Sequence, residues 1–186
     1  MSRRPVQFGL GDLETRLAGL LSDESPAPSA QPDTPPGGPV TFVHTGEVAA
    51  TRDGGVFSTV LGSCVSICLW DPSTGIGGIN HFLLPDQVSN GISSPRFGNV
   101  AVRTLLSKLS AYDVPASRLQ AKIFGGASVL RPGVPQKDAL GARNVELARV
   151  LLDLAGIPVV AEDVGGDHGR KLIFRAADGA AWVRKL

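Results

Sequence analysis

Cysteine, aromatic residues, long apolar runs and net charge are all scarce in this sequence. Two cysteines in 186 residues cannot form a dense disulfide framework. No apolar run approaches the roughly 20 residues that a membrane helix needs. A net charge of +1 argues against a nucleic-acid-binding protein, which normally carries a clear basic excess. We therefore expect a cytoplasmic protein with reduced thiols, no membrane insertion and no nucleic-acid partner.

Proline and glycine are plentiful, and they help to divide the chain. Leucines recur at helical spacing near the N-terminus, which predicts either a docking peptide or a marginal helix; they are Leu10, Leu13, Leu17, Leu20 and Leu21. The following stretch, SPAPSAQPDTPPGGP, cannot bury apolar surface and predicts an extended linker. We expect residues 1–39 to be a disordered extension with a Pro-rich linker, and residues 40–186 to be the folded domain.

The folded part alternates strand-like runs with two helical patterns. Apolar runs predict strands at 40–43, 56–61, 65–70, 76–84, 119–124, 157–161, 171–175 and 181–184. Apolar residues at helical spacing predict helices over about 102–112 and 144–154, with Gly156 just past the second. This order predicts an α+β fold, a mixed and largely antiparallel β-sheet sandwich with two main helices packed on it.

The strands at 65–70 and 76–84 look like a hairpin that brings a thiol to an imidazole. A four-residue loop over Asp71–Thr74 would place Trp70 opposite Gly75. Counting back along both strands then places Cys64 opposite His81, with Cβ atoms about 5 Å apart. A register slip of one residue would point the two side chains to opposite faces.

A cysteine beside a histidine suits nucleophilic catalysis. The thiolate is the nucleophile, and an imidazole with a pKa of about 6.5 can accept the thiol proton near neutral pH. Gly62 and Ser63 fit a tight turn whose N–H groups could hold an oxyanion. A small buried cysteine and a satisfied core histidine remain the structural alternative.

Several motifs resemble the signature of the chemoreceptor glutamine deamidase (CheD) family. They are TVLGSCV at 59–65, WDP at 70–72, NHFLLP at 80–85, AKIFGGA at 121–127, GARN at 141–144 and EDVGG at 162–166. The similarity spans roughly residues 40–186. It implies a protein-glutamine deamidase that acts on methyl-accepting chemoreceptors, with methylesterase activity and a CheC-type phosphatase partner in some members.

The resemblance also implies roles for particular residues. The family's nucleophile falls on Cys64 and its histidine on His81. Its third catalytic residue, a threonine in some members, falls six positions before the cysteine on Ser58. Thr59 is adjacent, and either hydroxyl could hydrogen-bond the imidazole, but the two should point to opposite strand faces. We expect Ser58 to orient the imidazole.

No cofactor or metal site is expected. Cys68 lies about 13 Å from Cys64 if the strand is extended, which is too far for a disulfide or a shared metal. His44 and His168 have no carboxylate or thiol at ligand spacing. Two other functions stay open, a non-catalytic module that binds receptors or chemotaxis proteins, and a thiol hydrolase with a different protein substrate.

Overall fold

The computed structural model describes residues 39–86, 93–128 and 139–186. The prediction of a disordered extension therefore lies outside the described residues, apart from Pro39. The strands are β1 (Val40–Phe42), β2 (Val48–Thr51), β3 (Val56–Leu61), β4 (Val65–Trp70), β5 (Gly77–Asn80), β6 (Gln120–Gly125), β7 (Val159–Val164), β8 (Arg170–Arg175) and β9 (Ala181–Lys185). The helices are α2 (Gly98–Ser110), α3 (Leu140–Leu154) and the short 3-10 helix η1 (Ala116–Arg118). Among the described residues, no helix is long and apolar enough to cross a membrane.

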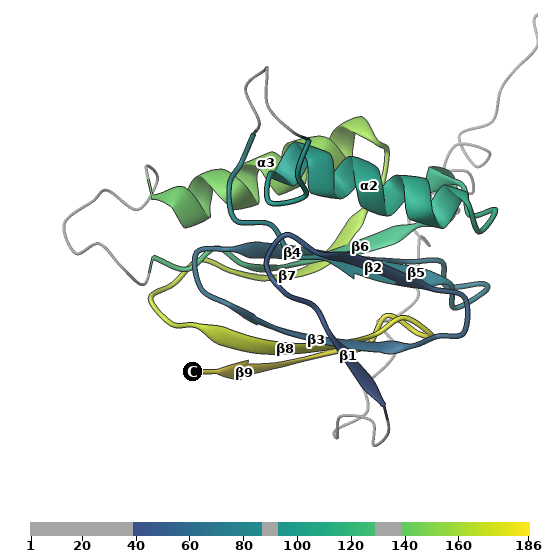
Figure 1. The fold of residues 1–186 in the computed structure, drawn as a ribbon, viewed down its shortest axis with the longest axis horizontal. Coiled ribbons are helices and arrows are strands. Elements are labelled where there is room, and N and C mark those ends of the chain that lie inside the picture. The colour runs from purple at the N-terminus through teal and green to yellow at the C-terminus, as the bar shows by residue number, and fades with distance from the viewer. Residues whose placement is uncertain (1–38, 87–92, 129–138) are drawn as a thin grey trace, which may run out of the picture. The chain divides into compact units, whose positions relative to one another are not determined.

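The described residues form three layers (Figure 1). A four-stranded sheet has the order β1-β3-β8-β9, and a five-stranded sheet has the order β2-β5-β4-β6-β7. Among the strand pairs of the described residues, only β1–β3 and β6–β7 are parallel. Helices α2 and α3 cover the outer face of the five-stranded sheet. The predicted α+β sandwich, mixed and largely antiparallel with two main helices, is confirmed.

Two hydrophobic cores separate the three layers. The first lies between the helices and the five-stranded sheet, and it includes Leu105, Leu109 and Leu152, all fully buried. The second lies between the two sheets and includes Phe174 and Cys68. Strand β4, in the middle of the five-stranded sheet, is therefore covered on both faces, which explains why all six of its residues are buried.

Some elements differ from the predicted ones. Helix α2 starts at Gly98, where a side chain would collide with Phe82, so close packing sets this end. Strand β2, with the sequence VAAT, was not predicted because alanine gives little strand signal. It pairs with β5 at the edge of the five-stranded sheet.

Three connections between the two sheets gather at one end of the sandwich. Strand β1 is parallel to β3, and Leu61 at the end of β3 pairs with Arg170 at the start of β8. The start of β4 lies beside the end of β6, since Val65 pairs with Gly125. The loops at 43–47, 62–64 and 165–169 therefore meet at this end, and the first two carry part of the candidate site.

Candidate active site

The β4–β5 hairpin has a register different from the predicted one. Trp70 pairs with Gly77, not with Gly75, and Cys68 pairs with Ile79. The Asp71 carboxylate causes the shift, because it accepts hydrogen bonds from the Ser73 N–H and from the hydroxyls of Ser73 and Thr74. Gly75 closes the loop with a φ of 71°. Residue 64 is thus opposite residue 83, and the prediction that Cys64 directly faces His81 is wrong.

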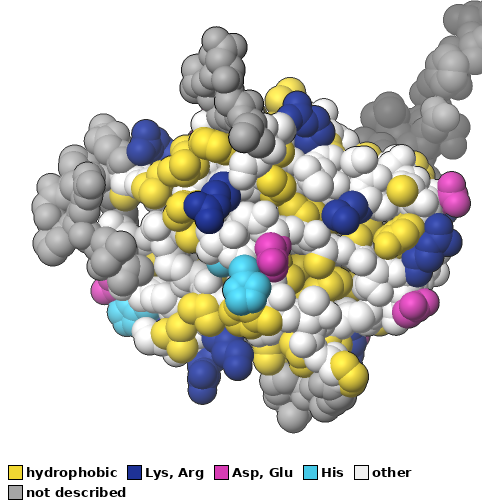
Figure 2. Space-filling model, viewed as in Figure 1, with side chains coloured by type: hydrophobic (Ala, Val, Ile, Leu, Met, Phe, Trp, Pro, Cys, Tyr) yellow, Lys and Arg dark blue, Asp and Glu magenta, His cyan; other side chains and the backbone are white. Residues whose placement is uncertain are grey.

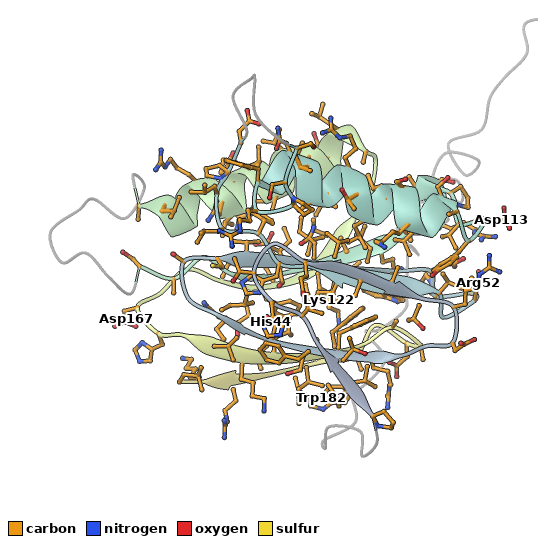
Figure 3. All side chains as sticks on the ribbon, viewed as in Figure 1. His44, Arg52, Asp113, Lys122, Asp167 and Trp182 are labelled. Atoms are coloured by element: carbon orange, nitrogen blue, oxygen red, sulfur yellow. The ribbon has the colours of Figure 1, made fainter. Side chains whose placement is uncertain are left out.

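Cys64 and His81 are nevertheless connected, through Thr45. The Thr45 hydroxyl lies 3.2 Å from His81 Nε2, and an interaction with the Thr45 side chain lowers the pKa of the Cys64 thiol. No hydrogen bond joins the thiol directly to the imidazole among the residues that the structure describes. Thr45 comes from the loop after β1, and nothing in the sequence pattern had pointed to it. The neighbouring residue His44 is labelled in Figure 3 near the middle of the view.

Thr59, not Ser58, contacts the imidazole. Thr59 Oγ1 lies 2.9 Å from His81 Nδ1, whereas the Ser58 hydroxyl donates to the Leu172 carbonyl at 3.0 Å. In β3 the side chains of Phe57, Thr59 and Leu61 alternate toward the space between the sheets. Ser58 therefore points to the other face of its sheet. The prediction that Ser58 orients the ring is wrong, because its hydroxyl bonds the Leu172 carbonyl and not the imidazole.

The hydrogen bonds around Thr59 fix the tautomer of the imidazole. The Thr59 hydroxyl donates its only proton to the Val43 carbonyl at 2.7 Å. It must therefore accept from His81, so Nδ1 carries the ring proton, and the Val43 carbonyl 3.4 Å from Nδ1 agrees with this. The lone pair of Nε2 then faces the Thr45 hydroxyl. His81 is only 4% exposed and Thr59 is fully buried, so this orientation is held by the interior.

The turn that carries Cys64 is held by all three of its carbonyl groups. The Gly62 carbonyl accepts from the Ala127 N–H at 2.8 Å, and the Cys64 carbonyl accepts from the Gly126 N–H at 2.8 Å. The Ser63 carbonyl accepts from the Asn144 side chain of α3 at 2.9 Å. The turn is therefore fixed by β6 on one side and by α3 on the other.

These contacts determine where the N–H groups of the turn point. In a trans peptide unit the C=O and the N–H point in opposite directions. Because the carbonyls of Gly62 and Ser63 face the protein, the N–H groups of Ser63 and Cys64 face away from it. Both residues are partly exposed. Two N–H donors beside a thiol match the requirement for holding an oxyanion.

Asn144 connects the segments that carry Cys64 and His81. Its Nδ2 donates to the Ser63 carbonyl and also to the Leu83 carbonyl, each at 2.9 Å. Ser63 precedes Cys64, and Leu83 follows His81 by two residues. Asn144 is fully buried. Asn144 is the last residue of the GARN motif, and nothing in the sequence pattern had pointed to this role.

Burial favours the neutral forms of both Cys64 and His81, and it shifts their pKa values in opposite directions. It raises the pKa of the Cys64 thiol above the ordinary 9.0, although hydrogen bonds from Thr45 and from the Cys64 amide lower it. It lowers the pKa of His81 below the ordinary 6.5, with a smaller opposite effect from the Val43 carbonyl. At neutral pH the resting pair is therefore a thiol and a neutral imidazole, and the imidazole is ready to accept a proton.

Cys68 has a different environment from Cys64. It is fully buried between the sheets, and burial raises its pKa well above 9.0. It lies opposite Lys122 across the β4–β6 pair, and Figure 3 shows Lys122 in the space between the two sheets. Within the described ranges, no group of three or more His, Cys, Asp or Glu side chains could hold a metal ion.

A largely apolar cavity of about 630 Å³ lies along α3. Its lining includes Gly126, Pro85 and Gly165, and Gly126 is the residue whose N–H holds the Cys64 carbonyl. The basic side chains on the face shown in Figure 2 are scattered and form no continuous patch. The surface beside the candidate site thus offers apolar contact more than a strong field of one sign.

Comparisons with known proteins agree on one family. The model of the family described as CheD chemotactic sensory transduction matches residues 83–185. "Probable chemoreceptor glutamine deamidase CheD 1" of Anaeromyxobacter dehalogenans is 47% identical over 92% of this chain and 99% of its own. "Probable chemoreceptor glutamine deamidase CheD" of Trichlorobacter lovleyi is 40% identical over 74% of this chain and 85% of its own. The protein of the same name from Hahella chejuensis is 37% identical over 77% and 69%.

Proposed function

The chain belongs to the CheD family, and on that premise we propose that it is a protein-glutamine deamidase acting on methyl-accepting chemoreceptors. Cys64 is the nucleophile and His81 is the base. Thr59 takes the orienting role that the sequence had suggested for Ser58. The substrate class follows from the names of the relatives, and the chemistry follows from the residues around the 62–64 turn.

In the first half-reaction, the Cys64 proton goes to His81 and the thiolate attacks the side-chain amide carbon of a receptor glutamine. The carbonyl oxygen becomes an oxyanion, which accepts hydrogen bonds from the N–H groups of Ser63 and Cys64. The imidazolium then gives its proton to the departing nitrogen, and ammonia leaves. A thioester between Cys64 and the receptor side chain remains.

In the second half-reaction, water replaces ammonia. Neutral His81 takes a proton from the water, and the resulting hydroxide attacks the thioester carbon. The carbon–sulfur bond breaks, the Cys64 sulfur regains a proton from the imidazolium, and glutamate is released. Throughout, the proton on His81 Nδ1 stays hydrogen-bonded to the Thr59 oxygen, which holds the charged ring in place.

The hydrogen bonds of His81, which assign its tautomer, are the observation that supports this proposal most directly. A histidine that only fills a core would need its two nitrogens satisfied, but it would not need its basic nitrogen turned toward a partly exposed thiol. Here Nδ1 is committed to Thr59, and Nε2 faces the hydroxyl that contacts Cys64. A purely receptor-binding module has no use for this arrangement.

The family resemblance implies a second activity and a regulatory partner. A methyl ester of glutamate presents the same acyl carbon, so the same thiol attack would release methanol and give methylesterase activity. A CheC-type phosphatase would compete with receptors for the surface around the active site. Adding such a phosphatase to a deamidation assay tests this, because competition lowers the rate without changing the free thiol.

The decisive experiment is mass spectrometry of receptor fragments after incubation with the protein. Deamidation raises the mass of a glutamine-containing peptide by about 1 Da and releases ammonia. We expect Cys64→Ala to abolish the change, because the attack on the amide carbon needs the sulfur as nucleophile. Cys68→Ala removes the other thiol and is the matched control, which should keep most of the activity. Retained activity in Cys64→Ala would refute the assignment.

Iodoacetamide labelling separates the enzyme from the binding module. Cys64 is partly exposed and Cys68 is fully buried. If Cys64 is the active-site thiol, iodoacetamide should alkylate it well before Cys68, and His81→Gln should slow the alkylation of Cys64. If His81→Gln leaves the alkylation of Cys64 unchanged, the imidazole does not serve the thiol and the non-catalytic module is favoured.

A further inference from the structure

The loop that carries Thr45 is fixed to the backbone of His81 on both sides. The Gly46 N–H donates to the His81 carbonyl at 2.6 Å, and the His81 N–H donates to the Glu47 carbonyl at 3.0 Å. At the other end of the loop, the Val43 N–H donates to the Ser58 carbonyl at 2.8 Å. The position of Thr45 against the imidazole is therefore set by main-chain hydrogen bonds rather than by the side chain alone.

The hydroxyls at the site form one directed chain of hydrogen bonds. Thr59 donates to the Val43 carbonyl, and His81 Nδ1 donates to Thr59. The free lone pair of Nε2 can then only accept, and the atom within reach is the Thr45 hydroxyl at 3.2 Å. With its proton given to Nε2, the Thr45 oxygen has a lone pair free for the proton of the nearby Cys64 thiol. The hydrogen bond by which Thr45 lowers the pKa of that thiol is the one that it donates to the thiolate.

We propose that Thr45 is a catalytic residue that relays the proton of the Cys64 thiol to His81 Nε2. The inference rests on the proposed thiol chemistry and adds a group that the family motifs quoted above do not contain. Thr45 interacts with both the reacting sulfur and the base. It is also exposed, so a substrate can approach the same side of the thiol.

The relay moves two protons and leaves the hydroxyl unchanged. As the Cys64 S–H bond breaks, its proton binds to the Thr45 oxygen, and the former Thr45 proton binds to His81 Nε2. The products are a thiolate, a neutral threonine and an imidazolium, so no other reactant is needed. The new Thr45 O–H now points to the thiolate and stabilises it as a donor. The reverse transfer returns the proton when the thioester is hydrolysed.

The test compares Thr45→Val, which keeps the shape but removes the hydroxyl, with Thr45→Ser, which keeps the hydroxyl. In the receptor-fragment assay we expect Thr45→Val to lower kcat by about 100-fold or more with little change in KM, as loss of positioned proton transfer does. Thr45→Ser should stay within about fivefold of the wild type. A Thr45→Val enzyme within about threefold of wild-type kcat would overturn the relay, as would a Thr45→Ser enzyme as slow as Thr45→Val.

Alkylation of Cys64 by iodoacetamide near neutral pH tests the relay without any receptor. The four proteins are wild type, Thr45→Val, His81→Gln and the double variant. If the hydroxyl works only by passing the proton to the imidazole, the double variant reacts no more slowly than the slower single variant. If the two effects multiply, Thr45 acts independently of His81 and the relay is wrong. Circular dichroism of each variant verifies the fold.

The alkylation result also distinguishes this inference from the proposed function. Should the wild type fail to deamidate any receptor fragment while the non-additive alkylation pattern holds, the relay stands and the substrate assignment falls. Should deamidation proceed normally in Thr45→Val, the enzyme assignment stands and the relay falls.

Discussion

Removing the Asn144 side chain should damage catalysis more than it damages the fold. This amide donates from α3 to the carbonyls of Ser63 and Leu83, which belong to the segments of Cys64 and His81. Asn144→Ala would leave both carbonyls without that donor in a fully buried place. Each lost buried hydrogen bond costs about 1–2 kcal/mol, so we expect the free energy of unfolding to fall by roughly 2–4 kcal/mol.

The catalytic loss arises from the peptide unit that joins Ser63 to Cys64. Its carbonyl is held by Asn144, and that contact turns the N–H of Cys64 toward the substrate. Without it the oxyanion donor is free to rotate. Loss of one such donor lowers kcat by about 100- to 1000-fold, and partial misorientation should cost about 10- to 100-fold. KM should change little, because the substrate's ground state does not use this donor.

The assay measures kcat and KM of Asn144→Ala at a temperature where urea unfolding shows that the variant is fully folded. Arg149→Ala is the control for changes in α3, because Arg149 lies on the same helix as Asn144. This substitution removes a surface ion pair with Glu162 of β7. It should keep the wild-type kcat. If kcat of folded Asn144→Ala equals that of the wild type, the amide only stabilises the fold and the reasoning about the turn is wrong.

Three further predictions concern the imidazole and its neighbours. Thr59→Val should lower kcat strongly and alter the pH–rate profile, since Nδ1 loses its acceptor, whereas Ser58→Ala should change kcat little; equal losses in the two variants would contradict the tautomer assignment. Because burial lowers the pKa of His81, the unfolded chain binds its proton more tightly. Its contribution to the free energy of unfolding is therefore complete above the ordinary pKa of 6.5 and is lost as the pH falls below it. Urea titrations of wild type and His81→Gln above and below that pH should show the larger acid loss in the wild type. The raised pKa of Cys64 predicts that its alkylation rate keeps rising through pH 9.0, and a plateau near neutrality would indicate a preformed thiolate instead.

The general architecture could be predicted because local patterns determine it. The strands at Val56–Leu61 and Val65–Trp70 have the predicted bounds, and Gly156 ends the second helix with a φ of 67°. Alternating or continuous apolar runs and a C-terminal glycine are properties of a few neighbouring residues. The sandwich of two sheets with helices on one side follows from their order along the chain.

The details of the site could not be predicted, because they depend on contacts between distant parts of the chain. The hairpin register was wrong by two residues, since side-chain hydrogen bonds to Asp71 enlarge the loop. Thr59 contacts the imidazole in place of Ser58, because the packing of the second sheet decides which face of β3 is interior. Asn144 lies 81 residues from Ser63, and no periodicity in the sequence connects the two. The position of Thr45 near Cys64 arises because two connections between the sheets, at 43–47 and 62–64, meet at one end of the sandwich.

The pKa directions explain why a shared hydroxyl suits this site. A thiol with a raised pKa and an imidazole with a lowered pKa do not form an ion pair at rest, so Cys64 is protected from random electrophiles until a substrate is in place. The proton must then move at the moment of attack. The chain from Cys64 through Thr45 to Nε2, and from Nδ1 through Thr59 to Val43, is already oriented for that movement. A solvent deuterium isotope effect on kcat should therefore be large in the wild type and smaller in Thr45→Val, where proton transfer no longer follows the relay. An equal isotope effect in both proteins would mean that the proton takes another route.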